Sequence, residues 1–377
     1  MKNLYDFKHR SPWKLNNTLL HNDEYMKELA DDLTLYFTQN DNGEMPPTTI
    51  WQAHKAVIRG LLIRKVAYIK KQAQITLKTW QRELYDLNRS NQLQPTAENR
   101  HLIMTISRLI HQQALEQTQT NMTRLKISHY IQGNKASKLL ANQLKQKQAN
   151  QKIAYILDNK GQKHATPREI SETFAKYYHT LYNLKGDSNT TQPTDTSIKA
   201  YLDKLALPQL TPQQQADLTK HIDIQEMLKV IQTLPTGKSP GPDGLTNLYY
   251  KKLSHVLAPH LTTAFNHATA QKSLPREMLL APIVTLPKPN KPPTTPKIFR
   301  PISLLNTEAK LFAKLYATRL GLIIPHIIHN DQVGFVKGRQ GSDNTRKAIN
   351  LLYKLQTQKE GGLFLSLDAE KAFDRLH

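Results

Sequence analysis

The sequence predicts an α+β, helix-rich chain, in which a basic helical amino-terminal half precedes a smaller part of mixed strands and helices. Three observations lead to this prediction. Apolar residues recur every three or four positions over most of residues 51–114, which is the spacing of one helix face. Short apolar runs beside proline- and lysine-rich turns follow residue 277, as expected of strands. The net positive charge lies entirely after residue 50.

The composition sets limits on the class of protein. With 377 residues, the chain is long enough for two or three domains. Because it has no cysteine, a disulfide framework, a thiolate nucleophile and a cysteine-based zinc site are excluded. The start has no apolar run, and the longest apolar stretch, residues 320–328, is too short to span a bilayer. We therefore expect an intracellular protein, nuclear or in a cytoplasmic ribonucleoprotein, that is not secreted and has no membrane partner.

The charge distribution indicates a polyanionic partner. The formal net charge is +22, with 18 basic and 4 acidic residues over 51–152 but 5 basic and 8 acidic over 1–50. A basic excess of this size favours nucleic acid, and the alternatives are a solvated basic surface or a basic helix on an anionic membrane.

The amino-terminal half is predicted to be helical. A short helix is expected at Glu24–Phe37, followed by a break at Pro46-Pro47. A long helix then runs from Trp51 to about Leu87, and a second begins near Thr96, so that the two form a basic hairpin. Six basic side chains of the long helix are candidates for contact with nucleic acid: Arg64, Lys65, Lys70, Lys71, Lys78 and Arg82. The alternative is a solvated helical bundle without a ligand.

Capping signals place the next elements. A short strand at Ile153–Leu157 precedes a turn, and Thr166-Pro167-Arg168-Glu169 forms a capping box that begins a helix running to about residue 184. Residues 185–199 resemble a linker. Further helices begin at Thr211-Pro212 and at Asp223.

The last third of the chain carries a candidate catalytic acid. Leu363–Leu367 is a mostly apolar run that predicts a buried strand, and Asp368 follows at its carboxyl end. A carboxylate fixed at a strand end suits a two-metal phosphoryl-transfer site that holds Mg²⁺ through oxygen. The alternative is that Asp368 is only a helix N-cap.

A strand hairpin with a basic tip is predicted before that acid. Its strands are Met278–Leu286 and residues 298–304, joined by the Pro/Lys-rich loop 287–291. Because residues 281–347 hold 11 basic and 3 acidic side chains, the hairpin suits an anionic ligand such as a triphosphate or a template backbone. A solvated hairpin is again the alternative.

Four sequence blocks resemble those of LINE-type (non-LTR retrotransposon) reverse transcriptases, in the family's order and approximate spacing. They are Thr236–Leu245, Phe299–Asn306, Asp331–Phe335 with Gly338–Gln340, and Ser366–Asp374. The first two resemble the fingers, and the last resembles the first catalytic block of the palm. The resemblance therefore implies a partial fingers and palm domain over residues 226–377.

The resemblance also implies roles for single residues. Asp368 corresponds to the first metal-binding aspartate, with the Ala369 carbonyl as a second oxygen ligand of Mg²⁺, and Phe373 to the side chain that excludes a ribose 2′-hydroxyl. Lys288 and Arg300 correspond to fingers cations near the triphosphate or template. Four further residues lie in a block associated with template and primer: Gln332, Gly334, Phe335 and Arg339. The implied partners are an RNA template, a DNA primer and, in the full-length enzyme, deoxynucleoside triphosphates.

The same resemblance gives the expected domains. Residues 1–45 resemble an endonuclease tail and connector, 46–190 the basic helical linker region with a short hairpin, 191–225 a linker and helix, and 226–377 the partial polymerase domain. The family's second catalytic block, a Tyr- or Phe-Ala-Asp-Asp hairpin, is not found in the sequence. We therefore expect the chain by itself to lack polymerase activity, to hold an incomplete Mg²⁺ site and to bind nucleic acid.

Two other functions stay open at this point. One is a catalytically dead protein, derived from a retrotransposon, that binds RNA or scaffolds a ribonucleoprotein. The other is a basic helical module for membranes or protein partners, which would explain the helices but not the four ordered blocks.

Overall fold

The computed structural model describes residues 13–125, 153–182, 194–205, 207–289, 292–358, 363 and 365–368. The chain divides into two compact units. The larger unit contains residues 1–56, 174–291 and 297–377, and the smaller unit contains residues 57–173 and 292–296. Helices dominate, and two small antiparallel sheets accompany them. The predicted helix-rich α+β class is therefore confirmed at this level.

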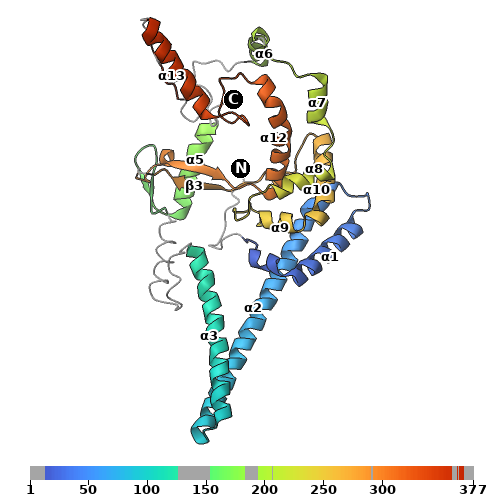
Figure 1. The fold of residues 1–377 in the computed structure, drawn as a ribbon, viewed down its shortest axis with the longest axis vertical. Coiled ribbons are helices and arrows are strands. Elements are labelled where there is room, and N and C mark those ends of the chain that lie inside the picture. The colour runs from blue at the N-terminus through green and yellow to red at the C-terminus, as the bar shows by residue number, and fades with distance from the viewer. Residues whose placement is uncertain are drawn as a thin grey trace. The chain divides into compact units, whose positions relative to one another are not determined.

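Figure 1 shows the elements of the larger unit. In chain order they are a 3-10 helix (Asn17–His21), α1 (Asp23–Asn40), the beginning of α2 (Pro47–Leu93), the end of α5 (Pro167–Tyr182), α6 (Asp195–Lys204), α7 (Pro212–Thr219), α8 (Ile224–Gln232), α9 (Asn247–Lys252), α10 (Ser254–Ala270), α11 (Arg276–Leu279), β3 (Ile283–Pro287), β4 (Phe299–Ser303), α12 (Thr307–Ile327) and α13 (Gly341–Gln358). A second 3-10 turn, Pro296–Ile298, leads into β4.

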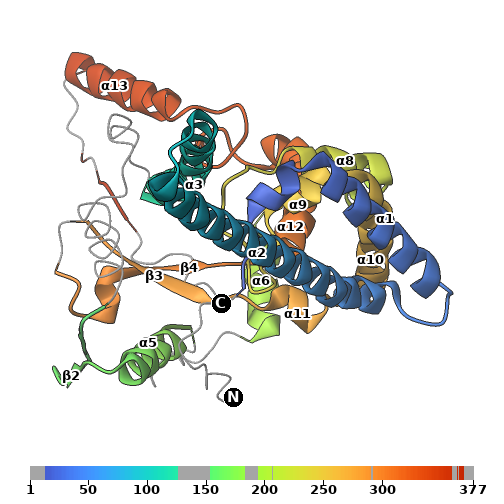
Figure 2. The same ribbon diagram turned by 90° about the horizontal axis from the view of Figure 1, so that it is seen from below.

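The core of the larger unit lies where α8, α10 and α12 pack together, as Figures 1 and 2 show. Met227, Leu261 and Leu315 are fully buried there. The guanidinium group of Arg319 closes one end, because it forms a bidentate pair with Glu226 at 2.8 and 2.7 Å and also donates to three backbone carbonyls. Burial of apolar groups and of fully paired polar groups stabilises the packing of these helices. The first sequence block follows α8 in the chain, and the second directly precedes α12.

The smaller unit contains the remainder of α2, α3 (Ala97–Leu125), β1 (Ile156–Leu157), β2 (Lys163–His164) and the start of α5. The helices α2 and α3 form the predicted antiparallel hairpin, and the Gln113 side chain donates to the carbonyl of Ala73 at 3.4 Å. The strands β1 and β2 pair in antiparallel register, with Ile156 opposite His164.

The predicted capping signals begin helices as expected. Thr166 and Glu169 exchange the two hydrogen bonds of a capping box at 3.3 Å each. Thr211 forms a second capping box before α7, and the Asp223 side chain accepts from the amide of Glu226 at the start of α8. Local hydrogen bonding therefore decides these helix starts.

Two strand predictions need correction. The strand predicted from Met278 begins only at Ile283, because residues 276–279 form the single helical turn α11 after Pro275. The strand predicted at Leu363–Leu367 is not formed by residues 363 and 365–367, whose leucines are 69–91% exposed. Apolar runs alone do not distinguish strand from helix, and no described segment pairs with 363–367 as a strand would require. Among the described residues, no helix is both long and apolar enough to cross a membrane.

Candidate functional site

The first sequence block lies directly against the end of the second. The Asn306 side chain accepts a hydrogen bond from the amide of Asp243 at 3.2 Å and donates one to the carbonyl of Glu277 at 3.1 Å. Gly241 lies so close to Asn306 that a Cβ atom at this position would overlap its backbone and side chain. Glycine is therefore required at Gly241 for close approach, and Asn306 joins two segments that are far apart in the sequence.

The residues before α1 also contact the first block. Gly244 has a φ of +77°, and a Cβ atom there would overlap Trp13. Leu15 donates its amide to the carbonyl of Gly244 at 3.0 Å, and Thr246 donates its hydroxyl to Asn17 at 2.6 Å. The segment predicted to resemble an endonuclease tail thus packs on the turn of the first block.

A buried group of charges lies beneath this turn. Lys55 Nζ is 2.5 Å from Glu308 Oε1 and 3.9 Å from Asp243 Oδ2. Trp51 Nε1 also donates to Glu308, whose side chain is fully buried. Burial raises the pKa of Asp243 to about 6, although the nearby ammonium group of Lys55 acts in the opposite direction. We call Lys55, Asp243 and Glu308 the buried charge cluster.

Lys288 and Arg300 lie on one hairpin, as predicted. Strands β3 and β4 pair in antiparallel register, with Leu286 opposite Arg300, and the amide of Lys288 donates to the carbonyl of Ile298 at 3.0 Å. Residues directly opposite in such a pair share a face, and so do residues two positions apart. Lys288 and Arg300 are therefore on the same face of the hairpin, and the side chain of Arg300 is exposed.

The hairpin is anchored at one point on its other face. Phe299 is buried there, and its ring meets that of Phe174 edge-on with centroids 5.1 Å apart. Ile283, farther along that same face, is 46% exposed, and on the cationic face Val284, Leu286 and Ile302 are 40–46% exposed. The two cations thus lie among apolar side chains on an open surface.

The third block forms a turn held from inside by Arg339. Its guanidinium group donates to the carbonyls of Pro325, Ile328, His329 and Gln332 at 2.6–3.2 Å. Arg339, predicted in the template–primer group, thus holds the loop after α12 together.

Phe335 projects from that loop. Its side chain is 97% exposed and its φ is +63°, a conformation uncommon for a bulky residue. The Gln332 side chain donates to the carbonyl of Gly334 at 3.0 Å beside it. A fastened loop that holds an exposed ring in an unfavourable conformation suggests a function for the ring.

The predicted metal site is described only in part. Asp368 is exposed, and no described segment pairs with its neighbours, whereas Ala369 and Phe373 lie outside the described residues. No group of three or more His, Asp or Glu side chains among the described residues could hold a metal ion. The described residues alone therefore do not fit a complete Mg²⁺ site, and the structure does not bring Asp368 together with Lys288 or Arg300.

The six basic side chains predicted on the long helix are all carried by α2. Five of them are exposed, and Lys65 is half-buried. They lie within the part of α2 that belongs to the smaller unit.

The residues that hold the blocks together were not among the predicted site residues, notably Lys55, Asn306, Glu308 and Arg319. Glu308 and Arg319 offered a signal, because both are charged residues at positions of α12 whose neighbours are apolar. Their partners could not be identified, since Lys55 and Glu308 are 253 positions apart.

Comparison with known proteins gives two kinds of match. The family described as "Reverse transcriptase (RNA-dependent DNA polymerase)" matches residues 286–377. The chain is 30% identical over 210 residues to the "Probable RNA-directed DNA polymerase from transposon BS" of Drosophila melanogaster. The aligned region covers 55% of this chain and 22% of that protein.

Two other relatives have similar coverage. The "Transposon TX1 uncharacterized 149 kDa protein" of Xenopus laevis is 34% identical over 45% of this chain and 13% of its own length. The "RNA-directed DNA polymerase from mobile element jockey" of Drosophila melanogaster is 27% identical over 41% of this chain and 17% of its own length. The chain thus spans less than a quarter of each of these curated relatives.

Proposed function

Because this chain belongs to the reverse transcriptases of LINE-type, non-LTR retrotransposons, we propose that its larger unit binds an RNA template paired with a DNA primer. In the whole protein, this unit would take part in RNA-templated DNA synthesis from deoxynucleoside triphosphates. The reverse transcriptase family generally uses divalent metal ions.

The observation that carries this proposal is the placement of two cations on one face of the β3–β4 hairpin, whose second strand belongs to the second sequence block. Lys288 and Arg300 share its open face, while Phe299 anchors the opposite face. Two cations on the same face of one hairpin suit the phosphates of a nucleic-acid strand or of an incoming nucleotide. The exposed apolar side chains between them suit contact with sugars.

Phe335 adds a stacking surface. Its exposed ring, held out by a loop that Arg339 fastens, is suited to lie on a nucleic-acid base. Base stacking on an aromatic side chain contributes roughly 1–3 kcal/mol per base. Gln332 and Gly334, which form the same turn, would set the position of the ring.

The metal-dependent part of the reaction needs more than the described residues. We propose Asp368 as one oxygen ligand of Mg²⁺, with the Ala369 carbonyl beside it and Phe373 near the sugar of the incoming nucleotide. The remaining ligands would have to come from outside the described residues. When bound, such ions stabilise the negative charge of phosphoryl transfer.

The basic side chains of α2 would bind the backbone of the same nucleic acid or of the flanking RNA. Contacts of this kind are independent of sequence and weaken as salt concentration rises. The net charge of +14 over residues 51–152 supports this role.

The test is binding of a fluorescein-labelled RNA–DNA template–primer to the full chain, followed by anisotropy from 50 to 300 mM salt. We expect Lys288→Ala with Arg300→Ala to weaken binding. Because each phosphate contact contributes about 0.9 to the slope of log affinity against log salt, the double variant should lower that slope by up to about 2.

A matched control is the pair Lys199→Ala with Lys204→Ala, which removes the same charge from exposed positions on α6. This control should bind nearly as tightly as the wild type. If both double variants lose the same affinity, binding follows total charge and the hairpin has no specific role.

A further inference from the structure

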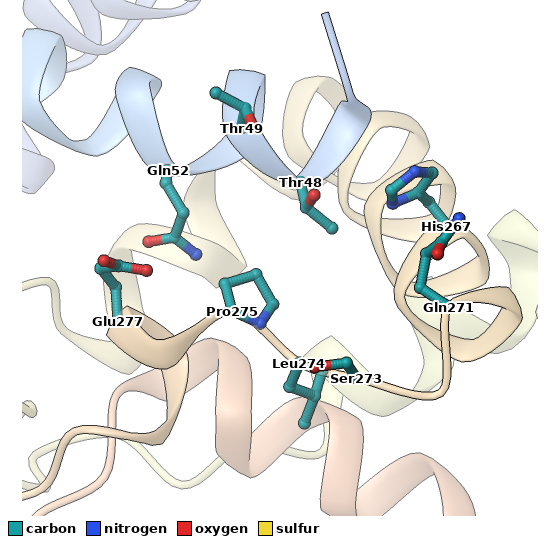
Figure 3. Close-up of a pocket in the computed structure, with 9 residues that line it drawn as sticks. All are labelled: Thr48, Thr49, Gln52, His267, Gln271, Ser273, Leu274, Pro275 and Glu277. Carbon is teal, nitrogen blue, oxygen red and sulfur yellow. The ribbon is translucent and has the colours of Figure 1, made fainter.

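A pocket of about 490 Å³ opens in the larger unit, and none of its described lining residues belongs to the hairpin or to the third block (Figure 3). The beginning of α2, the end of α10 and the segment leading into α11 form its walls. In Figure 3, Gln52 and Glu277 lie on one side of the pocket and His267 and Gln271 on the other. Its volume is within the range of sites that bind small molecules.

Most of the described residues that line the pocket carry a polar group, and none of them is a cation, while apolar atoms make up the larger part of its surface. The polar groups are hydroxyls, amides and an imidazole, and Glu277 contributes the one carboxylate among these lining residues. The Nδ1 atom of His267 is buried and has no hydrogen-bond partner in the described part of the chain. Such a lining repels a phosphate but suits a planar, neutral group with several hydrogen-bond donors and acceptors.

Cations are present just outside the pocket. Lys272 follows the lining residue Gln271 in the chain, and Arg276 precedes the lining residue Glu277. Neither cation lines the pocket itself, and both are exposed. Lys272 has a φ of 51° at the end of α10, where the amides of Lys272 and Ser273 bond to the carbonyls of Thr269 and Ala268. This hydrogen-bond pattern usually has glycine at the position of Lys272, so a lysine is held here in an unfavourable backbone conformation.

We propose that this pocket binds one unpaired guanine base of single-stranded RNA, with the flanking phosphates held by Lys272 and Arg276. A carboxylate accepts hydrogen bonds from both N1–H and the 2-amino group of guanine, and no other common base offers two adjacent donors on that edge. The inference rests on the proposed function for the nucleic-acid partner, but it concerns a different surface.

The test measures binding of the full chain to two fluorescein-labelled RNAs, a uridine 12-mer and the same RNA with one central guanosine. We expect the wild type to bind the guanosine RNA roughly tenfold more tightly, as for one bidentate contact. Glu277→Gln should abolish that preference while leaving affinity for the uridine RNA unchanged. Inosine lacks the 2-amino group of guanosine. An RNA with inosine in place of the guanosine should therefore bind with intermediate affinity.

Two variants separate base from backbone contacts. Lys272→Gly, which suits the left-handed conformation, should weaken binding of both RNAs by the same factor. Glu98→Gln makes the same charge change as Glu277→Gln at an exposed position on α3 and should leave the preference for guanosine intact.

Three results would overturn the inference. Equal affinity of the wild type for both RNAs overturns it without affecting the proposed function, whereas absence of binding to either RNA overturns both. Binding of an arginine-rich peptide that is lost in Glu277→Gln would assign the pocket to a cationic peptide instead.

Discussion

Lys55 Nζ lies 2.5 Å from Glu308 Oε1, and both side chains are at least nine-tenths buried. This pair joins the beginning of α2 to the start of α12, which follows the second sequence block. Because Asp243 of the first block lies within 3.9 Å of the same ammonium group, the buried charge cluster connects three distant segments of the larger unit.

Glu308→Gln should destabilise the chain by about 3 kcal/mol or more, because it removes one partner of a buried ion pair and leaves the Lys55 charge poorly compensated. The measurement is the free energy of unfolding from urea denaturation, followed by tryptophan fluorescence. The control is Glu172→Gln, which removes an exposed helical pair with Arg168 and should have no measurable effect. Equal effects of the two changes would contradict the assigned role of the cluster.

Because of Asp243, the free energy of unfolding should fall as pH rises from 3.8 to about 6. Its pKa is raised from 3.8 to about 6 in the folded chain, so the folded state binds the proton more tightly than the unfolded state. The contribution of protonated Asp243 to the stability of the folded chain is therefore complete below pH 3.8 and is lost as pH rises through 6. Its size is about 2–3 kcal/mol.

The measurement compares Asp243→Asn with the wild type at pH 4 and pH 7, as the difference in their free energies of unfolding. This difference should move in favour of the variant as pH rises, since asparagine has no charge to bury. The subtraction cancels the titration of other groups, such as His54, whose pKa burial lowers to about 3. A difference that stays flat, or moves toward the wild type, would show that Asp243 is not desolvated.

Gly241→Ala should destabilise the junction of the first two blocks by about 1–3 kcal/mol, the cost of forcing a methyl group into a filled space. The overlap is with the backbone as well as the side chain of Asn306, so rotation of one side chain does not relieve it. Gly321→Ala is the matched change, because it lies inside α12 with open space around it and should stabilise by up to about 1 kcal/mol. The measurement is the melting temperature of each variant in thermal unfolding. A shift in the same direction for Gly241→Ala and Gly321→Ala would refute this packing.

Replacing Phe335 should separate stability from binding. Phe335→Gly relieves the left-handed backbone conformation and should raise stability by about 1 kcal/mol, whereas Phe335→Ala keeps that strain. Both variants lack the exposed ring and should bind the RNA–DNA template–primer more weakly. Unchanged affinity in both would mean that the ring does not contact nucleic acid.

Local signals allowed part of the fold to be predicted. The capping residues Thr166, Thr211 and Asp223 begin helices where predicted, because an N-cap hydrogen bond depends on neighbours three positions away. The hairpin was predicted from its apolar runs and its proline- and lysine-rich loop. The predicted start of its first strand was wrong, because the apolar run from Met278 is compatible with both a helical turn and a strand.

Long-range relationships could not be predicted. The pairing of Lys55 with Glu308, the bridging side chain of Asn306 and the pocket beside Glu277 all depend on segments brought together by folding. Among the predicted site residues, Lys288 and Arg300 could be placed together because they belong to one hairpin. The catalytic role of Asp368 stays a prediction, and so does that of Phe373.

Hydrogen exchange of the full chain, with and without an RNA–DNA template–primer, tests directly where the nucleic acid binds. We expect slower exchange over residues 283–303 and 329–340, with a weaker effect along residues 64–82 of α2. Protection confined to other segments, or no protection at a concentration that saturates binding, would contradict the claim that the hairpin and the Phe335 loop form the nucleic-acid interface.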